Sequence, residues 1–507
     1  MTETSDIFLN GDRLDLTGFD ESGKTAQWTE THISWVVLTD RHAFKIKKPV
    51  RFGFLDFSTL DKRKNFCERE FSLNSVFSPE LYLGVVSLSS VNEKIRLTQS
   101  GEEPVEYAVK MKRFDSNALY RTRIENNRLT LAELESLAEA VAGIHRLTAA
   151  ADPESDFGTL ERFIYWNNEN FDAIRERIDD DKSLSRVMGL QAFMNDFIHN
   201  NESLLKARKD DGFIRDCHGD LHLGNVIWSH GQARLFDRIE FNDELRFIDV
   251  INDIAFTVMD LFYYRRSDLA WQFLNRYLRQ TGDYAGILLV GMYGAYRALV
   301  RAKVTLLTND QDNGTTGIPP DFLRHLDIAE KMIRCGDSGA SHVTLTITCG
   351  LSGSGKSYCA GRLSGEWGAV IVQSDVERKR MAGLDAREPG KDRITEGLYS
   401  RQSSDNVYQK LITIADQVLA DGYPVIVDAA FLRRSDRDRF RSLAARHKVP
   451  FSILFCQASP ETLRQRIIDR TGKGDPSDAT IEVLEHQLIT AELPAEDEAV
   501  YIDMRCN

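Results

Sequence analysis

The chain has 507 residues, of which 42% are hydrophobic and 28% are charged, and its formal net charge is −13. A single hydrophobic core rarely serves more than about 250–300 residues, so this length predicts two or three domains. The composition excludes disordered, collagen-like and disulfide-scaffold proteins. The negative charge disfavours nucleic acid and anionic lipid as partners.

The seven cysteines are scattered and show no C-x-x-C spacing, which indicates reduced thiols in a cytoplasmic protein. Residues 1–13 are polar and acidic, unlike a secretory signal. The most apolar stretch, 285–296, is shorter than the about 20 residues that span a bilayer. We therefore expect a cytoplasmic protein without a membrane partner; its oligomeric state is not indicated.

Between residues 33 and 113 apolar residues alternate in short runs, the pattern of strands, and one helix is expected at 62–77. Residues 130–334 look mostly helical, apart from strands and loops at 214–247 and a turn-rich loop at 307–320. A small lobe of about 1–115 and a large lobe of about 116–338 are therefore predicted, giving a two-lobed α+β domain.

From residue 343 onward strands alternate with helices, which predicts an α/β domain with a parallel, doubly wound sheet. The small, polar stretch 336–342 places the boundary between domains 1–338 and 339–507. We expect the two domains to be separable, although the short linker also allows an extensive interface.

The strongest motif is GLSGSGKS, which follows the apolar segment VTLTIT and opens a helix. Glycines in such a loop let backbone N–H groups turn toward phosphates at a helix N-terminus. Lys356 would reach the outer phosphates, and the Ser357 hydroxyl would hold Mg²⁺. The predicted phosphate cradle consists of Gly350, Ser352, Gly353, Ser354, Gly355, Lys356 and Ser357.

Other charged residues in this half suggest what the loop serves. Asp375 follows an apolar strand and could accept a proton from an attacking hydroxyl, while Arg378 could hold an anionic acceptor; the alternative is a helix cap with a surface arginine. Asp428 ends the next strand and is a candidate for organising Mg²⁺. Arg466 and Arg470 could clamp the transferred phosphate, or form a solvated face.

This half resembles small P-loop kinases related to polynucleotide kinase, zeta toxins and gluconate kinase, through GLSGSGKS, the strand-end SDVERK, VIVDAAF and the arginine pair. The resemblance implies a kinase rather than a motor or a switch GTPase. The acceptor is not encoded in these motifs.

The first half carries the segment HGDLHLGN, followed by a strand-end aspartate. In phosphoryl transfer a carboxylate such as Asp220 orients the acceptor hydroxyl, and the oxygens of Asn225 and Asp237 hold the metal. A small-lobe lysine should bind the nucleotide phosphates: Ala43 and Lys45 form an A-x-K arrangement on one strand face. Glu70 would hold that lysine.

Two of these assignments remain open. Lys47 shares the strand face of Lys45, and Glu68 neighbours Glu70; we favour Lys45 and Glu70, with the spare pair on the solvated surface. Cys217 and His222, in or beside the HGD segment, are interpreted as packing residues.

These residues resemble the aminoglycoside phosphotransferase family. The segments AFKIKKPVRFGFLDFSTL, CHGDLHLGN and DRIEFNDELRFIDVINDIAF are similar, more closely, to bacterial proteins that join such a domain to a P-loop kinase. The resemblance implies that Asp220 is the catalytic base, that Asn225 and Asp237 bind Mg²⁺, and that Asp253 supports the catalytic loop.

Two departures from the wider family and one arginine pair bear on the site. Asp237 begins DRIEF, so Glu240 would either assist the metal or face solvent. No G-x-G-x-x-G precedes Lys45, and the turn before THISW is a candidate phosphate cover. Arg297 and Arg301 indicate an anionic acceptor if they face the cleft, and otherwise an ordinary surface helix.

The sequence thus predicts a bifunctional phosphotransferase that uses ATP and Mg²⁺ to phosphorylate hydroxyls of small molecules. One alternative is an ATP-binding sensor with one or both modules inactive. The other is nucleic-acid 5′-hydroxyl kinase activity in the second half, which the net charge opposes.

Overall fold

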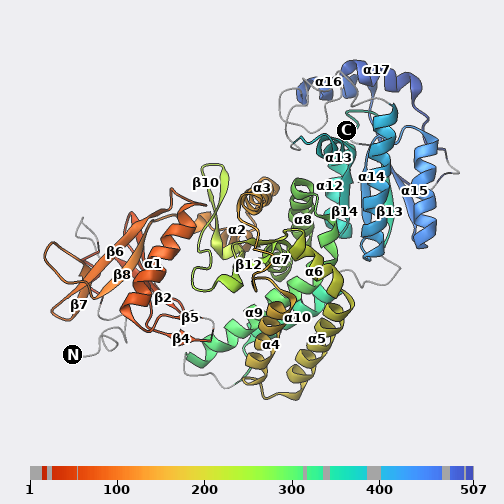
Figure 1. Cartoon of the computed structure of the whole chain (residues 1–507). Coiled ribbons are helices and arrows are strands. Elements are labelled where there is room, and N and C mark those ends of the chain that lie inside the picture. Colours follow the sequence, from red (N-terminus) through yellow and green to blue (C-terminus); the bar gives the residue numbers. More distant parts are fainter. Residues whose placement is uncertain are drawn as a thin grey trace. The chain divides into compact units, whose positions relative to one another are not determined.

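The computed structural model describes residues 14–19, 26–53, 55–311, 317–334, 343–384, 401–470, 480–495, 498 and 500–505. The chain forms two compact units (Figure 1). Unit one comprises Met1–Asp260 and Leu299–Leu323, and unit two comprises Leu261–Ala298 and Arg324–Asn507. Among the described helices, none is both long and apolar enough to cross a membrane.

Unit one begins with an antiparallel sheet in the order β1-β2-β3-β8-β6-β7. Its strands are β1 (Gln27–Glu30), β2 (Ser34–Leu38), β3 (His42–Lys47), β6 (Tyr82–Val91), β7 (Lys94–Leu97) and β8 (Glu106–Lys112). Phe44 and Ile46 of β3 point into a buried apolar cluster, so the alternate residues of this strand occupy the opposite face. Helix α1 (Leu60–Ser75), capped by Thr59, contacts β6 and β8; a short pair, β4 (Arg51–Phe52) and β5 (Leu55–Asp56), precedes it.

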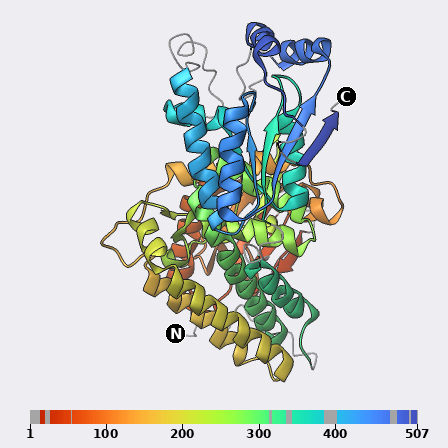
Figure 2. The same ribbon diagram turned by 90° about the vertical axis from the view of Figure 1, so that its right-hand side faces the viewer.

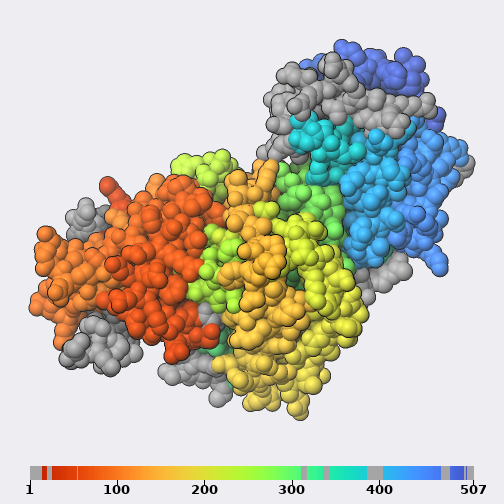
Figure 3. All heavy atoms as spheres, in the orientation of Figure 1, coloured from red at the N-terminus to blue at the C-terminus, as the bar shows by residue number. Residues whose placement is uncertain are grey.

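The rest of unit one is mostly helical, as predicted. Its helices are α2 (Tyr120–Glu125), α3 (Leu131–Leu147), α4 (Leu160–Arg175), α5 (Asp181–Asn200) and α6 (Glu202–Asp210). The side chains of α4 and α5, golden and yellow in Figure 3, cover part of its surface. Four short strands interrupt the helices as two antiparallel pairs, β9 (Ile214–Asp216) with β12 (Phe247–Asp249) and β10 (Val226–Ser229) with β11 (Gln232–Leu235).

Unit two contains a five-stranded parallel sheet in the order β14-β15-β13-β16-β17. The strands are β13 (Leu345–Cys349), β14 (Val370–Gln373), β15 (Val425–Asp428), β16 (Phe451–Gln457) and β17 (Val500–Arg505). Parallel strands are joined by right-handed crossovers, so connections that run in opposite directions lie on opposite faces. Helices α14 (Arg401–Ala420) and α15 (Arg434–His447) therefore share one face, as Figure 2 shows, and α12 (Lys356–Trp367) belongs to the other. The doubly wound sheet that the sequence predicted is confirmed.

The helices that complete the chain are α7 (Val250–Tyr263), α8 (Ser267–Thr281), α9 (Ile287–Gln311), α10 (Pro320–Ile333), α13 (Ser374–Met381), α16 (Pro460–Arg470) and α17 (Ile481–Thr490). The loop predicted at 307–320 is wrong for residues 307–311, because α9 continues through them. An established helix gains one hydrogen bond for each added residue, which here outweighs the local turn preference. The boundary at 338/339 stays a prediction, since residues 335–342 lie outside the described part.

Helix α8 packs within unit two, although the sequence assigned it to the first domain. It contacts α12 and β14, and Trp271 makes an edge-on contact with Tyr423, with 5.9 Å between ring centres. The side chain of Asn275 donates to the carbonyl oxygen of Ala369 (2.9 Å) and accepts from the Ile371 N–H (2.8 Å). β14 is an edge strand, so Asn275 satisfies backbone groups that no neighbouring strand reaches.

We expect Asn275→Ala to destabilise unit two. The change leaves the buried carbonyl of Ala369 and the part-buried N–H of Ile371 without their partner. A buried group without its partner costs about 1–3 kcal/mol. Thermal unfolding should show a lower melting temperature, and the Ile371 amide should exchange its hydrogen faster. Gln280→Ala, at a half-buried position on the same helix, serves as the control; equal effects of the two changes would contradict the role of Asn275.

Candidate active sites

In unit one, the predicted nucleotide lysine lies at the centre of an ion-pair network. Lys45, on the same face of β3 as Ala43, places its Nζ 3.1 Å from Oε1 of Glu70 on α1. A second ion pair joins Lys45 to Asp237. Burial disfavours the ammonium, but Asp237 and Glu70 outweigh it and raise the pKa of Lys45 well above its ordinary value. The structure therefore brings Lys45, Glu70 and Asp237 together.

Of the spare pair Lys47 and Glu68, only Glu68 lies on the surface as expected. Glu68 is exposed, but Lys47 is fully buried and lies 2.7 Å from Oε2 of Glu70. Glu240 is also buried and forms an ion pair with Lys47. The expectation that Lys47 lies on the solvated surface is wrong, and of the two alternatives for Glu240 the solvent-facing one is wrong. A buried charge is costly unless it is paired, and each of these two residues supplies the other's partner.

The two buried glutamates of this network, Glu70 and Glu240, have shifted pKa values. Burial acts to raise the pKa of Glu70, but the charges of Lys45 and Lys47 outweigh this effect and lower the pKa to about 2. For Glu240 burial prevails over the attraction of Lys47, and its pKa is raised. Glu70 is the shared partner of both ammonium groups.

The HGD segment is held in place by three residues on one face of α7. Asp253 accepts hydrogen bonds from the backbone N–H groups of His218 (3.2 Å) and Gly219 (2.8 Å). Thr257 donates to Leu221 O (2.7 Å), and Asp260 accepts from the Leu223 N–H (2.9 Å). The role expected for Asp253 agrees with this geometry. Thr257 and Asp260 were missed, although their spacing of four and seven residues from Asp253 is a recognisable helix-face pattern.

Gly219 is required in this segment by its backbone. Its φ is +85°, and a Cβ there would lie 2.7 Å from the carbonyl oxygen of Leu245. A side chain would therefore disturb the residue next to Asp220.

Asp220 and Asn225 are in direct hydrogen-bond contact. The Asn225 Nδ2 donates to the carbonyl oxygen (2.9 Å) and to Oδ2 (3.0 Å) of Asp220. This leaves the amide oxygen of Asn225 as the atom that could face a metal. Burial raises the pKa of Asp220, but His222, Arg301 and His218 together lower it below its ordinary value. Asp220 is therefore held as a carboxylate.

Two residues near Asp220 were underrated. His222 Nε2 lies 3.4 Å from Asp220 Oδ2, so this histidine does more than pack. Arg301 is half-buried, and its positive charge helps to lower the pKa of Asp220. Arg297, one turn earlier on α9, is buried and lies over the ring of Tyr296; its reading as a surface residue is wrong.

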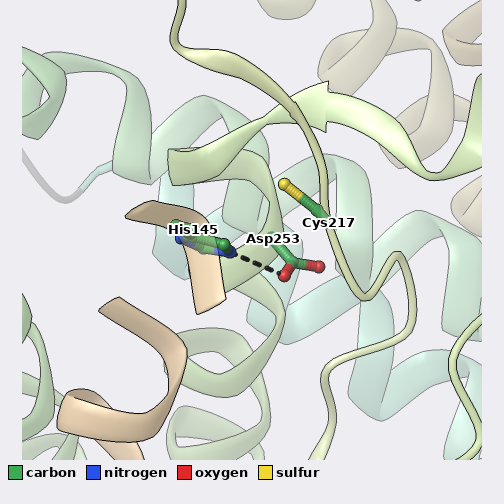
Figure 4. A group of neighbouring side chains, drawn as sticks. All are labelled: His145, Cys217 and Asp253. Atoms are coloured by element: carbon green, nitrogen blue, oxygen red, sulfur yellow. Dashed lines mark hydrogen bonds and ion pairs between the residues drawn. The ribbon is translucent and has the colours of Figure 1, made fainter. Parts of the chain in front are cut away.

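A group of His145, Cys217 and Asp253 has the composition of a metal site (Figure 4). The carboxylate of Asp253 already has partners. His145 Nε2 lies 3.0 Å from its Oδ2, and both carboxylate oxygens accept hydrogen bonds from backbone N–H groups. Burial raises the pKa of Cys217 well above its ordinary value, which keeps the thiol protonated. Because both oxygens of Asp253 already accept backbone hydrogen bonds, we interpret this group as support for the HGD segment.

Asp237 begins a strained turn. Its φ is +62°, a conformation that few residues other than glycine adopt, and its N–H donates to the hydroxyl oxygen of Tyr82 (2.9 Å). The candidate phosphate cover, the turn before residue 34, joins β1 to β2, and there Thr31 Oγ1 accepts from the Ser34 N–H (3.0 Å).

In unit two, the GLSGSGKS segment forms the turn between β13 and α12. Gly353 and Gly355 have φ values of +83° and +88°, and Gly350 one of +150°. A Cβ at Gly350 would lie 2.4 Å from Cys456 O and one at Gly353 2.9 Å from Leu463 O. The glycines are therefore needed both for the turn and for its close packing.

The lysine and two carboxylates gather where three strands end. Lys356 Nζ donates to the carbonyl oxygens of Gly350 (2.9 Å) and Leu351 (2.9 Å). Burial lowers the pKa of Lys356, and the charges of Asp428 and Asp375 oppose this effect. Asp428 accepts hydrogen bonds from Thr348 (3.3 Å) and Gln373 (2.9 Å). Carboxyl ends of parallel strands are where open α/β sheets bind ligands.

The remaining predicted residues lie around this loop. Arg378 pairs with Asp375 at 2.8 Å, and Ser357 is exposed at the start of α12. Arg466 donates to Gly353 O (3.3 Å), whereas the side chain of Arg470 lies outside the described residues. Gln487 was missed: its Oε1 accepts from the Ser352 N–H (2.9 Å), and no sequence signal marks it.

The residues present fit a nucleotide and Mg²⁺ at each site. Ser354 Oγ is buried beside the loop and has no hydrogen-bond partner in the described structure, and the surrounding glycines leave backbone N–H groups at a helix N-terminus. In unit one the donors offered to a metal are carboxylate and amide oxygens, which Mg²⁺ prefers.

Comparisons with known proteins agree with this reading. The model of the phosphotransferase enzyme family matches residues 91–290, and a model described as an AAA domain matches residues 345–494. The uncharacterized proteins Mb2027c of Mycobacterium bovis and Rv2004c of Mycobacterium tuberculosis are 33% identical over 459 residues, covering 90% of this chain and 88% of theirs. The chain belongs to their family. It is a kinase, built from a phosphotransferase domain and a P-loop kinase domain, and the resemblance stated from sequence is confirmed.

Solved structures similar to parts of the chain were also found. A choline kinase from Cryptosporidium parvum Iowa II covers 64% of this chain and 94% of its own, at 14% identity and a TM-score of 0.41. A gluconokinase from Sinorhizobium meliloti 1021 covers 32% and 83%, at 25% identity and a TM-score of 0.23.

Proposed function

We propose that each unit transfers the γ-phosphoryl group of Mg·ATP to a hydroxyl group of a small-molecule acceptor. The observation that carries the proposal is that each unit gathers a lysine and separate carboxylates from different elements at one place. Phosphoryl transfer depends on this combination, because its catalysis is mostly positioning and charge stabilisation.

In unit one, Lys45 binds the nucleotide phosphates and Glu70 holds Lys45 in place. Asn225 and Asp237 would hold Mg²⁺, which would neutralise charge on the phosphates. Asp220 accepts a hydrogen bond from the acceptor hydroxyl and takes its proton; its lowered pKa supports this role because the carboxylate stays ionised.

In unit two, the loop N–H groups and Lys356 bind the phosphates, and Ser357 and Asp428 hold Mg²⁺. Asp375 accepts the proton of the acceptor hydroxyl, and Arg378 binds the acceptor. Arg466 and Arg470 stabilise charge on the transferred group.

The acceptor of unit one is proposed to be anionic. Arg301 acts on Asp220 from the large lobe, and a guanidinium there suits a carboxylate or phosphate on the acceptor. A nucleic acid is disfavoured by the net charge of −13. The described cysteines are buried thiols, which supports a cytoplasmic location as part of the proposal.

A labelling experiment tests the function. Purified full-length protein is incubated with a small-molecule cell extract, Mg²⁺ and ATP labelled in its γ-phosphate, and the products are read by mass spectrometry. We expect labelled phosphate esters that depend on Asp220 in one product set and on Lys356 in another. Binding of ATP without any labelled ester would contradict the proposal and favour a nucleotide sensor. If an added 5′-hydroxyl oligonucleotide is labelled by unit two, the acceptor of that unit is a nucleic acid and not a small molecule.

A further inference from the structure

The network in unit one contains two charged residues to which the proposed reaction gives no role. The side chains of Lys47 and Glu240 are 0% and 3% exposed, as deeply buried as that of Glu70. Effective burial of one ion costs several kcal/mol, so a charge in such a place requires well-made contacts. Lys47 also lies over the ring of Phe57, 4.9 Å from its centre.

The contacts divide Glu70 between two lysines. Lys45 takes Oε1 at 3.1 Å, and Lys47 takes Oε2 at 2.7 Å. The two lysines are two residues apart on β3, so they project from the same face of the strand. With one lysine on each oxygen, the carboxylate plane of Glu70 is fixed and cannot rotate to offer both oxygens to Lys45.

Glu240 fixes Lys47 in turn. Its Oε1 pairs with the Lys47 ammonium, so a continuous chain runs from Glu240 through Lys47, Glu70 and Lys45 to Asp237. Three carboxylates face two ammonium groups in this chain. Loss of Lys47 would leave Glu240 without its partner and release one oxygen of Glu70.

We propose that Lys47 and Glu240 are positioning residues that fix Glu70, and through it Lys45, for binding the nucleotide phosphates in unit one. This inference rests on the proposed function of that unit. It places Glu240 at the opposite end of this series of ion pairs from Asp237, and not among the metal ligands.

The experiment measures Mg·ATP affinity by calorimetry in the full-length chain. All variants carry Lys356→Ala, so that binding reports unit one. Glu240→Gln and Lys47→Met should each weaken Mg·ATP binding about tenfold or more, the scale seen when residues that orient a binding group are lost. Lys112→Met, at an exposed position on β8, is the control and should leave the affinity unchanged.

The double variant Lys47→Met/Glu240→Leu separates positioning from folding. Replacing both charges by apolar side chains removes the burial cost, so the melting temperature should recover relative to the single variants. The affinity for Mg·ATP should stay about tenfold weaker, because Glu70 remains unfixed. Recovery of both quantities in the double variant would overturn the inference and leave a purely structural pair.

Two further outcomes separate failure of this inference from failure of the proposed function. If Glu240→Gln only raises the Mg²⁺ concentration needed for ATP binding, Glu240 is a metal ligand and the inference is wrong. If Lys45→Ala in the same background leaves Mg·ATP affinity unchanged, the proposed function of unit one fails before the inference is reached.

Discussion

Lys356→Ala should lower phosphoryl transfer by unit two by a factor on the order of 10²–10³, the effect of removing one preorganised charge contact. Lys356 is the first residue of α12, and the charges of Asp428 and Asp375 act on its ammonium, so the group is already oriented for binding phosphates. Its bonds to Gly350 and Leu351 are made by the side chain alone, and the fold should tolerate their loss.

Turnover is measured with each phosphorylated product that depends on unit two, and the melting temperature is measured alongside. Lys410→Ala, at an exposed position on α14, is the matched control. A Lys356→Ala variant with full turnover would remove this lysine from the proposed site; a lost melting transition would show a structural role instead.

Asp220→Asn and Asp237→Asn should separate chemistry from binding in unit one. Loss of the base should reduce kcat by about 10²–10⁴-fold while Mg·ATP affinity is nearly kept. Loss of the Asp237 carboxylate removes a charge that would face Mg²⁺, and it should weaken Mg·ATP binding directly. The two residues differ in surroundings, since Asp220 lies beside Asn225 and His222 whereas Asp237 pairs with Lys45.

Calorimetry and turnover on both variants, in a Lys356→Ala background, distinguish the roles. Asp210→Asn, at an exposed helix end, is the control. Equal loss of nucleotide affinity in both variants would contradict the division of roles.

Contiguous motifs were predictable because one short segment contains the whole local structure. GLSGSGKS follows the strand end and includes the glycine turn and the helix start. The HGD segment likewise carries Asp220 and Asn225 within six residues. Both segments lie where the sequence placed them.

Contacts between distant segments could not be read in the same way. The pattern gave Lys45 and Lys47 the same face of β3, and nothing in it revealed that Glu70 bonds both. The second partner of Lys47, Glu240, is 193 residues away in the sequence, so local spacing carries no information about this contact.

The position of α8 shows the same limit. The sequence predicted a mostly helical region at 130–334, but the bonds of Asn275 to the β14 segment depend on a strand edge about 95 residues later. Asparagine has a low intrinsic helix propensity, so its presence within α8 is explained by the tertiary contact alone.

The central claim, that one chain carries two independent nucleotide sites, is tested most directly by counting bound nucleotides. Calorimetric titration of the full-length protein with Mg·ATP should give two sites per chain. Lys45→Ala and Lys356→Ala should each leave one site, and the double variant should leave none. A single site in the unmodified protein, abolished by either change, would contradict the claim.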